Sequence, residues 1–227
     1  MSTNPGAVGA MTSDAQLLRL LTWLSPAFPV GAFGYSHGLE AAIREGAVTD
    51  AAALWAWIAG LLEHGSGWTD AVLFKAAHGV AGDKAALAEI VELAEALAPS
   101  LERRRESLGQ GAAFLIAARA WGPQPLDGAV AYSVAVGAVC GAAQVALEVA
   151  LAAWLHAFAA NLVSVAVRAI PLGQTNGVAV IAELEPVILA TAARAAQSSL
   201  DDLGSAAILS DITAMRHETL GLRLFIS

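Results

Sequence analysis

The sequence predicts an all-α fold, with a single domain of about ten helices packed around a central buried apolar helix. Hydrophobic residues make up 57% of the 227 residues and charged residues only 14%. Much of the hydrophobic fraction is alanine, which is the strongest helix former and only weakly apolar, so this composition is typical of closely packed helices. Valine-rich segments such as Val178–Ile181 are short and lie within helical periodicity, so no sheet is expected.

The stretch Ala142–Ile170 is expected to form the central helix, because neither proline nor glycine interrupts it before Pro171. Its uncharged window is just under the ~20 residues that span a bilayer, which leaves a helical membrane protein as an alternative. We favour a buried core helix, because small and polar residues recur on one face at helical spacing. We expect another helix to pack closely on this seam: Ala157, Asn161, Ser164 and Arg168.

Capping residues and helix breakers indicate the helices that precede this stretch. Ser13 with Gln16 resembles a capping box, Thr49 and Ser100 stand at N-cap positions, and glycine or proline follows most of the apolar runs. Helices are expected over six ranges: Asp14–Leu24, Gly38–Glu45, Thr49–His64, Trp68–Gly79, Asp83–Ala98 and Leu101–Trp121. A small-residue helix capped by Asp127 should follow and reach about Cys140. Gly137 and Gly141 would allow another helix to approach this one closely.

Beyond the central helix, Val178–Ser198 is expected to be helical, with Pro186 forcing a kink or a break. Residues 210–227 are expected to form a short helix and a tail. Residues 1–13 are expected to be disordered, and they lack the charged and apolar regions of a signal peptide.

Composition excludes several classes of function. The formal net charge of −8 provides nothing to neutralise phosphates, so nucleic acid is not an expected partner. The single Cys140 cannot form an internal disulfide, which fits a reducing compartment such as the cytoplasm. No two histidines stand at metal-ligand spacing and no P-loop occurs, so we expect no metal site, cofactor or nucleotide site. Of the five histidines, His37 and His217 are the most informative.

Two segments carry unusual chemistry. The loop Ser25–Ser36 is rich in glycine, proline and aromatic residues, including Phe33 and Tyr35, and is either packed inward or used for binding. It continues into Gly34-Tyr35-Ser36-His37-Gly38, which matches the nucleophile elbow of serine hydrolases but lacks the preceding strand that the elbow needs. A hydrolase using Ser36 is therefore a weaker alternative than a scaffold without catalytic residues.

The C-terminal end is apolar, with Leu222 and Phe225 close to the last residue, and it follows the polar run Met215, Arg216, His217 and Glu218. An apolar end must dock either on this protein or on another one, since disordered ends are normally polar. Arg168 lies near a helix C-terminus, where it would either favourably meet the helix dipole or point at a carboxylate of another chain.

Three segments together resemble the UreF family of urease accessory proteins: SPAFPVGAFGYSHGLE, NLVSVAVRAIPLGQTNG and SDITAMRHETLGLRLF. The resemblance covers nearly the whole chain from Leu17. It implies a non-enzymatic, all-α chaperone that forms a two-fold dimer and acts in nickel insertion into urease. The implied partners are the accessory protein UreD (also called UreH), the GTPase UreG and apo-urease. This chain would regulate GTP hydrolysis by UreG.

The resemblance also implies roles for particular residues. The helical domain would span residues 14–209 and a partner-binding tail residues 210–227. The resemblance carries Arg216, His217 and Glu218 over to this chain as partner-binding tail residues, and Arg168 stands where the family has a basic residue implicated in the GTPase contact or the dimer. We also expect partner contacts from further residues of the tail, the aromatic loop and the segment after the central helix: Met215, Leu222, Phe225, Phe33, Tyr35 and Gln174. This chain departs from the family pattern at Gly34, His37, Gly221 and Ile226.

Overall fold

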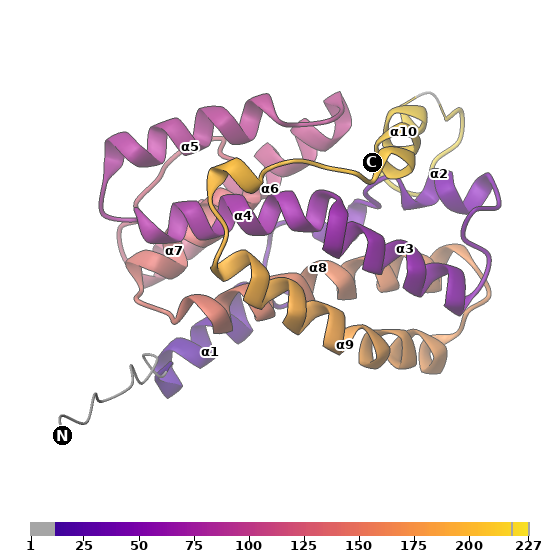
Figure 1. The fold of residues 1–227 in the computed structure, drawn as a ribbon, viewed down its shortest axis with the longest axis horizontal. Coiled ribbons are helices and arrows are strands. Elements are labelled where there is room, and N and C mark those ends of the chain that lie inside the picture. Colours follow the sequence, from indigo (N-terminus) through magenta and orange to yellow (C-terminus); the bar gives the residue numbers. More distant parts are fainter. Residues whose placement is uncertain (1–11, 219, 227) are drawn as a thin grey trace, which may run out of the picture.

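The computed structural model describes residues 12–218 and 220–226, and within these ranges the chain is all-α with no strand (Figure 1). The expectation of disorder for residues 1–13 concerns a segment that lies mostly outside the described residues. The helices run in the order α1 (Asp14–Trp23), α2 (Leu39–Arg44), α3 (Ala51–His64), α4 (Ser66–Gly79), α5 (Lys84–Ala96), α6 (Leu101–Ala118), α7 (Tyr132–Ala142), α8 (Leu147–Ala169), α9 (Gln174–Ala196) and α10 (Ile208–His217).

The predicted fold class is confirmed, and α8 is the helix around which the others pack. It contacts α2, α3, α4, α7 and α9. Its buried side chains include Leu151, Leu155, Leu162 and Val165, each fully enclosed. Because most of the helix surface is apolar, it is stable only when other helices remove it from water.

The small residues of α7 allow α4 to approach closely, as the sequence predicts. A Cβ atom at Gly137 would lie 2.4 Å from the Phe74 carbonyl oxygen, and one at Gly141 would lie 2.2 Å from the His78 carbonyl oxygen. Real Cβ atoms do not approach an oxygen so closely, so any larger residue at either position would push the two helices apart.

The predicted start of the central helix at Ala142 is wrong, because a turn separates α7 from α8. Gln144 adopts a φ of 55°, and the Val145 N–H donates to the Cys140 carbonyl oxygen at 3.0 Å. A left-handed residue ends a helix even without glycine or proline, so breakers alone did not reveal this turn. Asp127 also does not cap α7, which begins at Tyr132 after Ala131.

Among the described residues, the seam on α8 borders a cavity and is not packed closely by another helix, so the expectation of close helix packing there is wrong. Ala157, Asn161 and Ser164 are only half-buried and line a cavity of about 230 Å³. The Asn161 side-chain amide donates to the Tyr35 carbonyl oxygen at 3.4 Å, so the loop before α2 covers part of this face.

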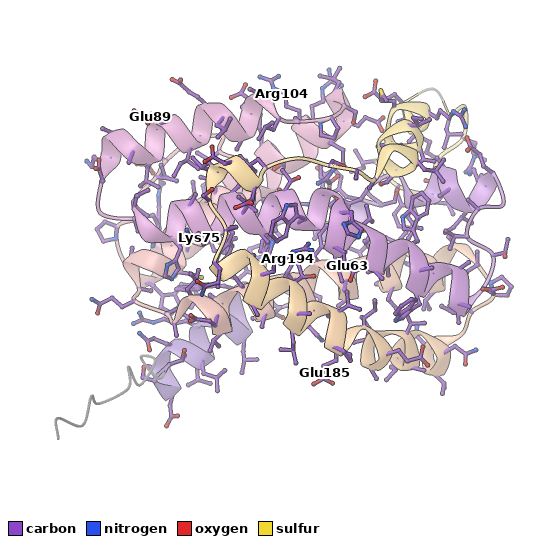
Figure 2. The ribbon with its side chains drawn as sticks, viewed as in Figure 1. Glu63, Lys75, Glu89, Arg104, Glu185 and Arg194 are labelled. Carbon is purple, nitrogen blue, oxygen red and sulfur yellow. The ribbon has the colours of Figure 1, made fainter. Side chains whose placement is uncertain are left out.

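Helix α9 passes through Pro186 without a break and is fastened at its C-terminal part to α3 and α4. Figure 2 shows Arg194 on α9 beside Glu63 on α3, where the guanidinium donates to the Glu63 carbonyl oxygen and lies 4.0 Å from the Trp68 ring centre. Lys75 on α4 donates to the Ser198 carbonyl oxygen at 2.7 Å, which fixes the end of α9.

By length and apolar composition, one described helix, Leu147–Ala169, could cross a membrane, and 56% of its most apolar window is buried in the structure. The core helix of a soluble protein meets the same criterion, so the finding does not favour a membrane span.

Candidate functional site

The C-terminal helix α10 returns to lie beside α2, which is far from it in the sequence (Figure 1). Gly38, immediately before α2, makes this approach possible. A Cβ atom there would lie 2.8 Å from Ala214 Cα, and the φ of 75° is one that side chains disfavour. The tail therefore packs on its own chain in this structure, one of the two possibilities that the sequence left open.

His217, at the end of α10, is completely buried between two carboxylates. Its Nδ1 lies 2.8 Å from Glu102 Oε2 at the start of α6, and its Nε2 lies 3.2 Å from Glu40 Oε2 on α2. We call these three residues the His217 cluster. The cluster joins three helices that are remote in the sequence, so it fixes where α10 lies.

Glu40 also holds the backbone of the chain end. Its carboxylate accepts hydrogen bonds from the N–H groups of Leu224 at 2.9 Å and Phe225 at 3.0 Å. It also forms an ion pair with Arg44 at 2.7 Å. Burial by itself would raise the pKa of the Glu40 carboxyl. The hydrogen bonds from Leu224, His217 and Phe225, with the charge of Arg44, more than offset this and lower the pKa below its usual value.

The second carboxylate of the cluster has partners of its own. Glu102 forms an ion pair with Arg223 of the tail, and its backbone N–H donates to Glu218 Oε1 at 3.2 Å. An acidic side chain at the first turn of a helix is favoured there, since the N–H groups and the helix dipole both attract it. His217 and two residues that follow it, Glu218 and Arg223, thus contact the same helix end.

Arg168 brings together the three segments on which the family resemblance rests. Its guanidinium lies 3.6 Å from the ring centre of Phe33 and 4.5 Å from that of Phe225, and its Nη1 donates to the Phe33 carbonyl oxygen at 3.0 Å. The Ile226 N–H donates to the Gly34 carbonyl oxygen at 2.8 Å. The aromatic loop, the end of α8 and the chain end therefore form one continuous site.

Apolar side chains are exposed at this site. Phe33 is 66% exposed, and along the tail Leu222, Leu224 and Ile226 are 80%, 70% and 62% exposed, whereas Phe225 is buried. We call Phe33, Leu222, Leu224 and Ile226 the tail patch. Exposed apolar groups that gather in this way mark an interaction surface more often than isolated ones do.

The remaining predicted site residues occupy different positions. Met215 and Arg216 are exposed on α10, with Arg216 paired to Glu45 at 3.0 Å. Tyr35 is half-buried and contributes its carbonyl oxygen to Asn161. Gln174 is exposed at the first residue of α9, outside the contacts described above.

Sequence reasoning missed Glu40, Glu102 and Arg223, which complete the site. It also missed the surroundings of His37, whose Nε2 lies 3.2 Å from the fully buried Glu106 Oε1. Arg103 Nη1 lies 2.6 Å from Glu106 Oε2, and Arg103 Nη2 lies 3.9 Å from Asp70 Oδ2. We call His37, Glu106, Arg103 and Asp70 the His37 cluster. A glutamate in the first turns of a helix is the normal pattern for an exposed residue, so the sequence carries no signal of its burial.

Burial governs the protonation of the His37 cluster. It lowers the pKa of His37 to about 4, and the nearby Arg103 acts in the same direction, while Glu106 opposes them. Burial raises the pKa of Asp70 above its usual value, against the charge of Arg103 and a hydrogen bond from Ser133. His37 is therefore neutral at pH 7. The cluster borders the cavity of about 230 Å³, whose lining includes His37, Asp70 and Arg103.

Ser36 does not have the geometry of a hydrolase nucleophile. Its side chain is completely buried, and its Oγ accepts a hydrogen bond from the Glu40 N–H in the first turn of α2 at 3.4 Å. No strand precedes it in the described part of the chain. The short match to the nucleophile elbow is thus a buried turn that leads into α2.

The described residues hold no group of three or more histidine, cysteine, aspartate or glutamate side chains placed to bind a metal ion. Cys140 is buried, and burial raises the pKa of its thiol to about 12, so the thiol is protonated at pH 7. At the chain end, charged groups hold an apolar segment in place.

The fold and the site together define an all-helical protein whose C-terminal end is held by the carboxylates of Glu40 and Glu102 and displays apolar side chains. The model of the UreF family matches residues 48–185. The chain belongs to the UreF family of urease accessory proteins, as the resemblance of its three segments predicts.

Curated relatives match over nearly their full length. A protein named urease accessory protein UreF from Rhizobium etli is 54% identical over 223 residues, which cover 96% of this chain and 100% of the relative. The protein of the same name from Mesorhizobium japonicum is 51% identical over 219 residues, which cover 95% and 98%. Urease accessory protein UreF 1 from Brucella canis is 53% identical over 214 residues, which cover 93% and 94%.

Proposed function

We propose that this chain is a non-enzymatic chaperone of urease maturation. In this proposal it bridges a UreD/UreH-like accessory protein and a UreG-like GTPase on apo-urease during nickel insertion, and it regulates GTP hydrolysis by that GTPase. The observation that carries the proposal is membership of the UreF family, with relatives named as urease accessory proteins over nearly the whole chain.

The tail patch supports assigning the UreD/UreH-like partner to the C-terminal end. Burying an apolar side chain of this size is worth roughly 1.5–3 kcal/mol. Ordering a free chain costs ~1–2 kcal/mol per residue in backbone entropy. Here the N–H groups of Leu224, Phe225 and Ile226 are already hydrogen-bonded within the chain, so much of that cost is met before a partner arrives.

We further propose that the protein works in the cytoplasm as a two-fold homodimer. In this proposal Arg168 and Gln174 lie near the contact with the GTPase or with the second copy. The charge-poor composition supports an apolar, self-complementary contact. Light scattering of the purified chain tests this, and a monomer mass at micromolar concentration contradicts it.

The test of the partner assignment replaces exposed apolar side chains without disturbing the fold. The double variant Leu222→Ser with Leu224→Ser is expected to lose co-purification with the UreD/UreH-like protein from cells that carry the urease genes. Urease from those cells should then lack nickel. The matched control is Val178→Ser with Leu189→Ser, because both side chains are exposed on α9, away from the tail.

The control variant is expected to co-purify as the native chain does. If the tail variant still binds its partner at the native level, the partner assignment is wrong. If neither variant nor the native chain co-purifies with any urease accessory protein, the proposed function itself is wrong.

A further inference from the structure

The cavity of about 230 Å³ beside α8 is lined by apolar and charged side chains together. An apolar cavity of about 150 Å³ is large enough to bind benzene, so this one has room for a molecule of that size with a polar group attached. Pro26 and His156 belong to the lining and are exposed, so the cavity opens to solvent. The aliphatic part of the lining includes Leu24, Val30 and Ala160.

Asp70 brings a carboxylate to this lining whose charge is only partly balanced. Its Oδ2 lies 3.9 Å from Arg103 Nη2, beyond hydrogen-bond distance, and its Oδ1 accepts from the Ser133 hydroxyl at 3.1 Å. Arg103 lies much closer to Glu106, with 2.6 Å between Nη1 and Oε2. One guanidinium therefore stands beside two carboxylates and compensates chiefly that of Glu106.

The protonation of Asp70 agrees with this geometry. Burial raises the pKa of its carboxyl above the usual value, against the charge of Arg103 and the hydrogen bond from Ser133. A cation placed beside the carboxylate lowers that pKa again, so binding of a cation and ionisation of Asp70 favour each other.

Aromatic rings belong to the same lining. Tyr132 precedes the serine that donates to Asp70, and its ring centre lies 4.9 Å from that of Trp154. The ring centre of Phe158 lies 5.1 Å from that of His37. The faces of aromatic rings are electron-rich and attract cations. The carboxylate and the rings therefore favour a ligand that is cationic at one end and apolar at the other.

We propose that this cavity binds a small primary ammonium ion with an apolar body, whose ammonium group pairs with Asp70 while the body lies among the aromatic and aliphatic lining. An ammonium group has three N–H donors and no lone pair, so it complements a carboxylate, which only accepts. A carboxylate ligand would instead meet Asp70 as a like charge. This site goes beyond the proposed function and does not depend on it.

The test compares the affinity of the purified full chain for benzylammonium and for benzyl alcohol, which are similar in shape and differ in charge. Chemical-shift titration of the amides of Ala157 and Asn161 gives both dissociation constants. We expect benzylammonium to bind at least about tenfold more tightly, the factor that corresponds to one charge-assisted hydrogen bond. Equal affinities, or no binding of benzylammonium at millimolar concentration, overturn the proposal.

Asp70→Asn removes the charge and keeps an oxygen that accepts from Ser133. We expect this variant to bind benzylammonium about tenfold more weakly than the native chain and benzyl alcohol equally well. Asp127→Asn is the matched control, because Asp127 pairs with Arg119 at the surface, outside the cavity lining. It should bind both probes as the native chain does. Native affinity of Asp70→Asn for benzylammonium overturns the proposal.

Ala157→Phe tests where the probe lies. Ala157 lines this cavity, whereas Asp70 also borders a smaller one of about 80 Å³ to whose lining Ala157 does not belong. We expect the added ring to abolish binding of both probes, and Ala190→Phe, at an exposed position of α9, to leave it unchanged. Native affinity of Ala157→Phe for benzylammonium places the probe elsewhere and overturns the proposal. The comparison of the two probes on the native chain does not depend on any variant folding.

Discussion

Two histidines with little or no exposure, His37 and His217, contact carboxylates on the same helix, and their surroundings differ. His37 pairs with Glu106 and His217 with Glu102, and the two glutamates are one turn apart on α6. His37 faces one carboxylate that Arg103 already neutralises, and its pKa is lowered to about 4. His217 faces two carboxylates, one on each ring nitrogen. The two rings therefore differ in the number of carboxylates that they face, one for His37 and two for His217.

The largest effect is expected from breaking the ion pair of the His37 cluster. Glu106→Ala leaves the Arg103 guanidinium buried without its nearest carboxylate, and losing one partner of a buried pair costs about 3–5 kcal/mol of the free energy of unfolding. Chemical denaturation measures this. Glu89→Ala on α5 is the control, an exposed glutamate labelled in Figure 2, and should change stability by less than about 0.5 kcal/mol. Equal effects of the two changes would contradict the burial of the cluster.

The pH dependence of stability should carry the signature of His37. Its pKa in the folded chain, about 4, lies below the ordinary value of 6.5, so the unfolded chain binds the proton first as the pH falls. Stability should therefore decrease between about pH 6.5 and about pH 4, by about 2–3 kcal/mol from this group. The free energy of unfolding of the His37→Gln variant, measured by denaturation across this pH range, tests the assignment of this decrease to His37, because glutamine does not titrate. The variant should lose this part of the slope, and an unchanged slope would assign it to other groups.

Glu40→Gln tests the other cluster with a smaller change. The glutamine can still accept from one or two N–H groups, but the charge that His217 and Arg44 face is removed, at a cost of about 1–3 kcal/mol in docking of the tail. Because the pKa of Glu40 is lowered in the folded chain, its contribution is present above the ordinary glutamate pKa and is lost as the pH falls through the lowered one. Limited proteolysis of the tail at pH 7 should be faster in the variant. Digestion at the native rate would show that Glu40 does not hold the chain end.

The smallest effect is expected at the cavity that the His37 cluster borders. Ala157→Phe places a ring toward the cavity of about 230 Å³, so it should change the free energy of unfolding by less than about 1 kcal/mol. Ala159→Phe on the same helix is the matched control, because Ala159 is fully buried and overpacking there should cost about 1–3 kcal/mol. Thermal unfolding ranks the two variants, and the reverse order would show that the cavity is closed in solution.

The fold could be predicted because its signals are local. Ser13 and Ser100 accept hydrogen bonds at helix starts as predicted, and the periodicity of apolar residues identifies the core faces. The predicted cap Thr49 is wrong by one residue, because Asp50 caps α3. The break between α7 and α8 was missed, since Gln144 gives no sign of its left-handed conformation. The site could be predicted only in part. His217 and Arg168 stand out in the sequence, but their partners Glu40, Glu102 and Phe33 come from distant segments, and pairings of this kind depend on the tertiary arrangement.

The chain end is held through its main chain. The N–H groups of Leu224, Phe225 and Ile226 donate to Glu40 and to the Gly34 carbonyl oxygen, while the side chains of Leu222, Leu224 and Ile226 point into solvent. Main-chain atoms therefore anchor the chain end, and side-chain atoms form its exposed surface. Under the proposed function, replacing the three outward side chains changes the surface that a partner contacts and leaves the main-chain hydrogen bonds intact. Substitutions at these three positions, whether natural or from a randomised library, can therefore change the binding specificity of the chain end without changing the fold.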